Sequence, residues 1–193
     1  MSTTKNLTPL VPHDPTRPSE AIHATALYVF HALGGLHHLT DHDADLLCRA
    51  AAGLRFIRST STFTASDDTL FRIALADLST RDAHVVETAA RYAADLAPAT
   101  GRRCIGGPHR DGDRKALWLA GILRLADALC PAGSTGAKGV YATWTDSVLF
   151  LEFDGRNVTP SLLRGAAQRV SALEALSGRR LVLANSNARR GAA

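Results

Sequence analysis

Cysteine and aromatic side chains are scarce in this sequence. The chain of 193 residues holds three cysteines, Cys48, Cys104 and Cys130, and no two of them form a Cys-x-x-Cys pair. An odd number this small excludes a disulfide framework, so we expect reduced thiols in a cytoplasmic protein. Aromatic residues make up 6% of the chain. Trp118 stands within an apolar stretch, which indicates a core position rather than a platform for stacking bases.

Long hydrophobic runs are absent as well. No apolar run approaches the roughly 18 residues that a membrane-spanning helix needs, so we expect no membrane partner. Residues 1–18 lack the apolar centre of a secretory signal, and we interpret them as a mobile N-terminal arm. The sequence also has no Gly-x-Ser-x-Gly turn, no Walker loop and no Gly-x-Gly-x-x-Gly stretch, which excludes the common nucleophile and nucleotide-phosphate motifs.

The composition is that of a globular protein with a modest positive charge. Apolar residues make up 46% of the chain and charged residues 21%, which is enough apolar surface for a core. The formal net charge of +4 permits an anionic partner without requiring one.

Hydrophobic periodicity predicts five helices and then a short strand-rich segment of β-β-α-β order. We therefore expect a mostly α fold with a small α+β C-terminal unit. The expected domains are a mobile arm over 1–18, a helical domain over 19–132, a small α+β subdomain over 139–184 and a flexible tail over 185–193. The expected landmarks are helix starts at Ser19, after Thr40 or Asp41, at Ser66, at Ser79 and near Asp113, strands over 140–144 and 148–153, a helix between Thr159 and Gly178, and a strand over 179–184.

Four segments resemble a known family in their order and spacing. They are "LLCRAAAGLRFI" (46–57), "RKALWLAGILRLADAL" (114–129), "VLFLEFDG" (148–155) and "SALEALSGRRLVL" (171–183). Over residues 21–183 the chain resembles the C-terminal domain of the exopolyphosphatase/guanosine pentaphosphatase (Ppx/GppA) phosphatase family. The resemblance implies an HD-domain-like helical bundle followed by the small α+β subdomain. The 193 residues do not include the actin-like domains that carry the catalytic carboxylate in that family, so we expect a stand-alone domain.

The resemblance also places the metal-binding positions of an HD site. His23 stands for the first ligand, Asp127 in "RLADAL" for the last, and Arg55 and Phe56 replace the adjacent His-Asp pair. A guanidinium offers no lone pair to a cation, and neither does a phenyl ring. We therefore expect no metal cofactor, with Phe56 filling the former metal cavity and Arg55 pairing with Asp127. In the alternative, Mg²⁺ or Mn²⁺ is held by His23, Asp127 and further ligands.

A Gly-rich basic loop ahead of the fifth helix is the best candidate for binding an anion. Guanidinium groups match phosphate oxygens, and backbone N–H groups at a helix start favour negative charge. The alternative is an ordinary solvated loop, because Asp111 and Asp113 weaken the local field. The candidate polyanion-binding residues are Arg102, Arg103, His109, Arg110, Arg114 and Lys115.

A second concentration of polar residues, "HHLTDHDAD" over 37–45, contains three histidines and three aspartates. We interpret Asp41 and Asp43 as carboxylates at a helix start, where they accept hydrogen bonds from exposed N–H groups. A metal site formed by these residues is the alternative.

Three functions follow from these observations. The first is a catalytically inactive Ppx/GppA-type domain that binds polyphosphate or a phosphorylated nucleotide, or regulates a partner, and that forms a homodimer as the resemblance implies. The second is a metal-dependent phosphohydrolase acting on polyphosphate or nucleotides. The third is a structural interaction module that pairs with a Ppx/GppA-type catalytic chain.

Overall fold

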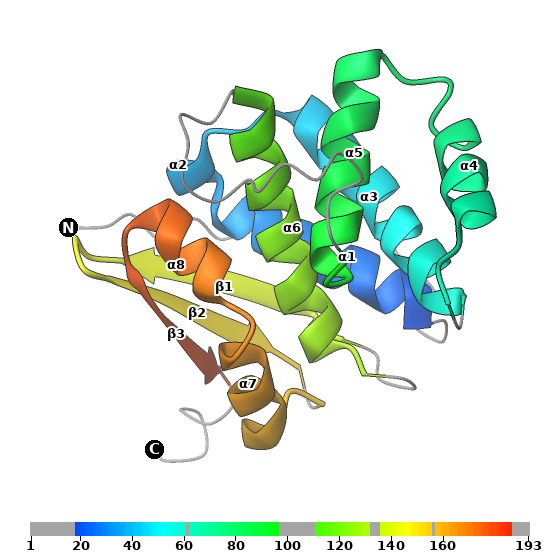
Figure 1. The fold of residues 1–193 in the computed structure, drawn as a ribbon. Coiled ribbons are helices and arrows are strands. Elements are labelled where there is room, and N and C mark those ends of the chain that lie inside the picture. The colour runs from blue at the N-terminus through cyan, green and yellow to red at the C-terminus, as the bar shows by residue number, and fades with distance from the viewer. Residues whose placement is uncertain (1–17, 61, 97–110, 132–135, 156, 187–193) are drawn as a thin grey trace, which may run out of the picture. The chain divides into compact units, whose positions relative to one another are not determined.

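The computed structural model describes residues 18–60, 62–96, 111–131, 136–155 and 157–186. This part of the chain is mostly helical and carries a three-stranded mixed sheet near its C-terminus, which confirms the expected fold class at that level (Figure 1). No helix among these residues is long and apolar enough to cross a membrane. The elements are α1 (Pro18–Ala32), α2 (Gly34–His37), α3 (Asp41–Ser59), α4 (Ala65–Ile73), α5 (Thr80–Ala93), α6 (Asp111–Leu129), β1 (Gly139–Trp144), β2 (Val148–Asp154), α7 (Pro160–Ala167), α8 (Ser171–Ser177) and β3 (Arg180–Asn185).

Most helix starts follow from side chains that cap the exposed backbone N–H groups. The expected starts after Thr40 and at Ser79 are confirmed: the backbone N–H of Thr40 donates to Asp43 at 2.9 Å, and Ser79 Oγ accepts from the N–H of Asp82 at 3.1 Å. The expected cap at Ser66 is wrong, because Thr64 caps α4 and accepts from the backbone N–H three residues later at 3.3 Å. Thr64 is followed at that spacing by an aspartate that bonds back to it, whereas Ser66 is followed by a threonine.

The expected single helix between Thr159 and Gly178 is two helices, α7 and α8. Both expected ends are confirmed, because Thr159 accepts from the backbone N–H of Leu162 at 3.3 Å and Gly178 ends α8 in the left-handed conformation, with φ of 65°. Between the helices, backbone N–H groups bond three residues back instead of four, and the chain turns. Val170 lies in this turn and is buried. A continuous helix along the surface would not necessarily bury the residue at this position.

The sheet has the order β1-β2-β3, with an antiparallel β1–β2 pair and a parallel β2–β3 pair. Helices α7 and α8 form the crossover that a parallel pair requires. Along β2, the alternate residues Leu149, Leu151 and Phe153 are fully buried, while Phe150 is 38% exposed. One face of β2 is therefore core.

The chain divides into two compact units, and the domain boundary expected near residues 133–139 stays a prediction. Residues 39–123 form one unit, here called the helical unit, and residues 1–38 with 124–193 form the other, here called the sheet unit. Helix α1 belongs to the sheet unit because it packs against β1, and Thr25 Oγ1 accepts a hydrogen bond from the backbone N–H of Ala137 at 3.2 Å. This contact joins residues too far apart in the chain for periodicity to reveal.

Candidate functional site

Arg55 and Phe56, the residues expected to stand in place of an HD metal pair, lie on α3 in the helical unit. Arg55 is exposed, and Phe56 is half-buried. The ring of Phe56 stacks on Phe71 with centroids 6.2 Å apart and meets Phe63 edge-on at 6.4 Å. Phe56, Phe63 and Phe71 thus form an aromatic cluster. Because neither Arg55 nor Phe56 offers a lone pair, these residues do not fit a metal ion.

The other two residues of the expected HD site lie in the sheet unit. His23 is on α1 and Asp127 is near the end of α6, and both side chains are partly buried. The expected pair between Arg55 and Asp127 joins residues of different units and stays a prediction. Across the described ranges, no three side chains of the His, Cys, Asp and Glu types come together in a way that could hold a metal ion.

Helix α4 is attached to the rest of the helical unit by a single buried residue. Phe71 is 3% exposed and is the one buried residue of α4. Its ring lies against Gly53 of α3, where an added Cβ would be 2.6 Å from Cε2 of Phe71. The absence of a side chain at Gly53 therefore makes room for Phe71.

An ionic cluster of Asp68, Arg72, Glu87 and Arg91 adds a second attachment between α4 and α5. Arg91 donates through Nε to Glu87 at 3.1 Å and through Nη2 to Asp68. Arg72 lies 3.3 Å from Asp68 and 3.5 Å from Glu87. Arg91 is 7% exposed, and burial lowers its pKa from the ordinary value. Since a guanidinium stays charged in proteins, the two carboxylates compensate a buried cation.

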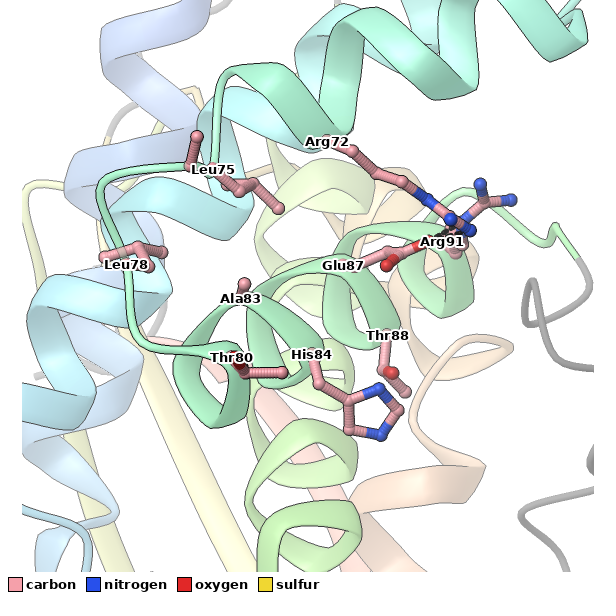
Figure 2. A pocket seen from close by; sticks show the side chains of 10 residues that line it. Arg72, Leu75, Leu78, Thr80, Ala83, His84, Glu87, Thr88 and Arg91 are labelled. Carbon is pink, nitrogen blue, oxygen red and sulfur yellow. Dashed lines mark hydrogen bonds and ion pairs between the residues drawn. The ribbon is translucent and has the colours of Figure 1, made fainter.

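A cavity of about 480 Å³ lies between the end of α4, the turn that follows it and α5. The close view shows Arg72 and Arg91 near Glu87 in one part of the lining and the leucines of the turn, Leu75 and Leu78, in another (Figure 2). The cavity thus has a charged end and an apolar side. Its size falls within the range of small-molecule pockets.

The first turns of α3, α5 and α6 are joined by three contacts between a basic and an acidic side chain, which we call the helix-start cluster. His42 lies 3.4 Å from Asp82, His84 lies 3.5 Å from Asp113, and Lys115 Nζ lies 2.8 Å from Asp43. Each pair bridges two of the three helices. Three helix N-termini therefore meet where α6 begins, immediately after the basic loop of the sequence.

Asp43 has a larger role than capping. Its side chain is 1% exposed and accepts hydrogen bonds from Lys115 and from the backbone and hydroxyl groups of Thr40. Burial by itself raises the pKa of Asp43, but Lys115 and Thr40 outweigh it and hold the pKa below its ordinary value. Asp43 is therefore a buried carboxylate with a matched cation, in addition to its expected position at a helix start.

The predicted polyanion-binding residues fall into three groups. Arg114 is exposed in the first turns of α6. Lys115 is half-buried and its charge is already matched by Asp43. Arg102, Arg103, His109 and Arg110 lie outside the described residues.

Sequence reasoning missed the ionic cluster and the cavity. Part of the cluster was detectable, because Asp68 and Arg72, like Glu87 and Arg91, are four residues apart on a helix and such pairs face each other. The bond between Arg91 and Asp68, which joins α5 to α4, has no local signal.

No protein-family model matches the chain, and no curated protein sequence matches it.

Proposed function

We propose that this chain is a catalytically inactive, HD-like domain related to the Ppx/GppA family and that it binds a polyanion, either polyphosphate or a phosphorylated nucleotide. The observation that carries the proposal is the meeting of three helix starts at the N-terminus of α6, with Arg114 exposed beside them. Helix N-termini favour negative charge, and a basic loop leads directly into this point of the chain.

The carboxylates of the helix-start cluster define which residues supply the affinity. Asp43, Asp82 and Asp113 already occupy the helix starts and cancel much of the favourable field. Binding therefore depends on Arg114 and the loop residues Arg102, Arg103, His109 and Arg110. The guanidinium groups of the four arginines can make paired bonds with phosphate oxygens. A polyanion suits this arrangement because it can contact several arginines at once.

Binding is tested with the full chain and inorganic polyphosphate by titration calorimetry. We expect the Arg102→Ala/Arg103→Ala/Arg110→Ala variant and the Arg114→Ala variant to bind more weakly, and the affinity to fall with added salt. Lys115 is left intact because it holds Asp43. The matched control is Arg164→Ala/Arg180→Ala/Arg190→Ala, which removes the same charge elsewhere. Equal binding by the loop variant and this control would refute the role of the loop.

The loss of catalysis is supported by the chemistry at Arg55 and Phe56. In the alternative, a metal-dependent phosphohydrolase, His23 and Asp127 hold Mg²⁺ or Mn²⁺ with other ligands. A phosphatase assay with each cation, on polyphosphate and on nucleotides, separates the two. We expect no turnover. Turnover that is lost in Asp127→Ala would establish the enzyme instead.

A second candidate function is an interaction module, which is favoured by the outer face of α4. Leu70 is 56% exposed and Ile73 is 64% exposed, and they are three residues apart on this helix. Such a pair contacts water unless a partner covers it, either a second copy of this chain or a Ppx/GppA-type catalytic chain. Light scattering of the purified chain tests the homodimer. We expect Leu70→Asp/Ile73→Asp to convert a dimer to a monomer, and an unchanged mass would remove α4 from the interface.

A further inference from the structure

We infer that the cavity between the end of α4 and α5 binds a small amphipathic carboxylate, with its anionic group at the ionic cluster and its apolar chain along Leu75 and Leu78. This inference does not rest on the polyanion site, whose proposed ligands are Arg114 and the residues of the basic loop. The cavity and the helix-start cluster share His84.

The dimensions of the cavity suit a short chain molecule. Its volume is about 480 Å³, within the range of roughly 300–1,000 Å³ found for small-molecule pockets. Residues of α5 line it from Thr80 to Arg91, a length of about 16 Å at 1.5 Å per residue. The charged residues Arg72, Glu87 and Arg91 gather in one part of this lining, and Leu75 and Leu78 lie in another (Figure 2).

Two hydrogen-bond donors at the cavity have no acceptor among the described residues. The first is the hydroxyl of Thr88, a residue that lines the cavity and is 7% exposed as a whole. The second is Nη1 of Arg91, which uses Nε for Glu87 and Nη2 for Asp68. Neither atom is a fully buried donor left unpaired, so both can hydrogen-bond to water. A ligand carboxylate takes the place of that water.

The charge balance favours a singly charged anion over a dianion. Asp68 and Glu87 carry two negative charges that match the two guanidinium groups of Arg72 and Arg91. A guanidinium has five N–H groups, so each arginine can keep its present carboxylate and bond a second one. A phosphate dianion in the same place meets the repulsion of Asp68 and Glu87 with twice the charge. A carboxylate is therefore the better fit.

The apolar side of the cavity accepts the hydrocarbon part of the ligand. Leu75 is 6% exposed and Leu78 is half-buried, and Ala76 and Ala83 complete this side. Covering these side chains removes apolar surface from water, which supplies the non-directional part of the affinity.

The test is a titration of the full, ¹⁵N-labelled chain with hexanoate, followed by amide and arginine Nε–Hε resonances. We expect saturable shifts among residues 72–91 at millimolar ligand, and no such shifts with hexylammonium, which has the same chain and the opposite charge. Hexyl phosphate is the third probe, and we expect it to bind more weakly than hexanoate. Tighter binding of hexyl phosphate, or equal shifts with hexylammonium, would overturn the assignment.

Two variants test the two ends of the site. Thr88→Val keeps the shape of the side chain and removes the hydroxyl, so we expect hexanoate to bind about fivefold more weakly, the effect of one hydrogen bond. Leu78→Glu places a negative charge on the apolar side and should abolish the shifts. The matched control is Leu70→Glu, which makes the same change on the outer face of α4, outside the cavity.

The same spectra distinguish a loss of binding from a loss of structure. Amide resonances of residues remote from α4 and α5 report whether each variant keeps its fold. If Leu70→Glu and Leu78→Glu weaken hexanoate equally while both stay folded, or if hexanoate shifts no residue of 72–91 in the parent chain, the cavity is not its binding site.

Discussion

Gly53 and Phe71 are in such close contact that no side chain can be added at residue 53 without displacing the ring. A Cβ at this position would lie 2.6 Å from Cε2 and 2.7 Å from Cζ of Phe71, and 3.2 Å from the Cβ of Ala90. Phe71 is the one buried residue of α4, so this contact decides whether α4 stays attached to α3.

Gly53→Ala should therefore destabilise the chain. Overpacking costs about 1–3 kcal/mol, and the higher helix propensity of alanine returns up to about 1 kcal/mol. Urea unfolding measures the difference. Gly165→Ala is the control, because nothing lies within 4 Å of a Cβ at that position of α7, and it should stabilise the chain by about 0.5–1 kcal/mol. Equal behaviour of the two variants would contradict the proposed attachment.

Removal of Arg91 should cost more than removal of an exposed arginine. In Arg91→Met, two partly buried carboxylates lose their main cation, so we expect a loss of about 2–3 kcal/mol of unfolding free energy. In Arg49→Met, the lost partner is Asp77, and both side chains of that pair are about half exposed. Such a pair contributes roughly 0–1 kcal/mol. Similar losses in both variants would show that the ionic cluster is not a stabilising attachment.

The pair of Asp43 and Lys115 should make stability depend on pH. The folded pKa of Asp43 lies below its ordinary value, so its contribution is present above the unfolded pKa of about 3.9 and is lost as pH falls through the folded pKa. In Lys115→Met, the buried carboxylate keeps only Thr40, which should cost about 3 kcal/mol near pH 7. The same variant should lose less near pH 3, where Asp43 can protonate. Urea unfolding at both pH values measures this, and an equal loss at both would reject the pairing.

Cys130 should not react with thiol reagents in the folded chain. Burial raises the pKa of its thiol to about 11, and the sulfur lies 3.3 Å from Thr25 Oγ1. At pH 8 a thiol of this pKa holds roughly a hundredfold less thiolate than an ordinary one. In a Cys48→Ser/Cys104→Ser variant, we expect an aromatic disulfide reagent to label Cys130 only after denaturant is added. Rapid labelling of the native chain would show that the site is open.

Several local features of the fold were predictable because their causes lie within a few residues of the chain. Thr40, Ser79 and Thr159 each precede a residue whose backbone N–H or side chain completes the cap, and Gly178 ends α8 with a positive φ. Where two hydroxyl residues competed, at Thr64 and Ser66, the aspartate three residues after Thr64 decided the start of α4.

The candidate sites were predictable only in part. The lack of a metal-binding side chain at Arg55 and Phe56 is a matter of residue type, and it was visible in the sequence. The partner of Lys115 was not, because Asp43 lies 72 residues earlier in the chain. That pairing moves Lys115 from a candidate ligand-binding residue to a residue that stabilises the fold.

The sequence by itself determined that helices come first and a strand-rich segment follows, several of the element ends, and the absence of metal-binding side chains at residues 55 and 56. The tertiary structure decided that α1 packs with β1, that Arg91 bonds Asp68 on another helix, and that a cavity lies between the end of α4 and α5. The physical reason is the separation along the chain of the residues that interact. Caps and periodic faces arise from neighbours within about one helical turn, whereas burial and the pairing of charges depend on which distant segments exclude water from one another.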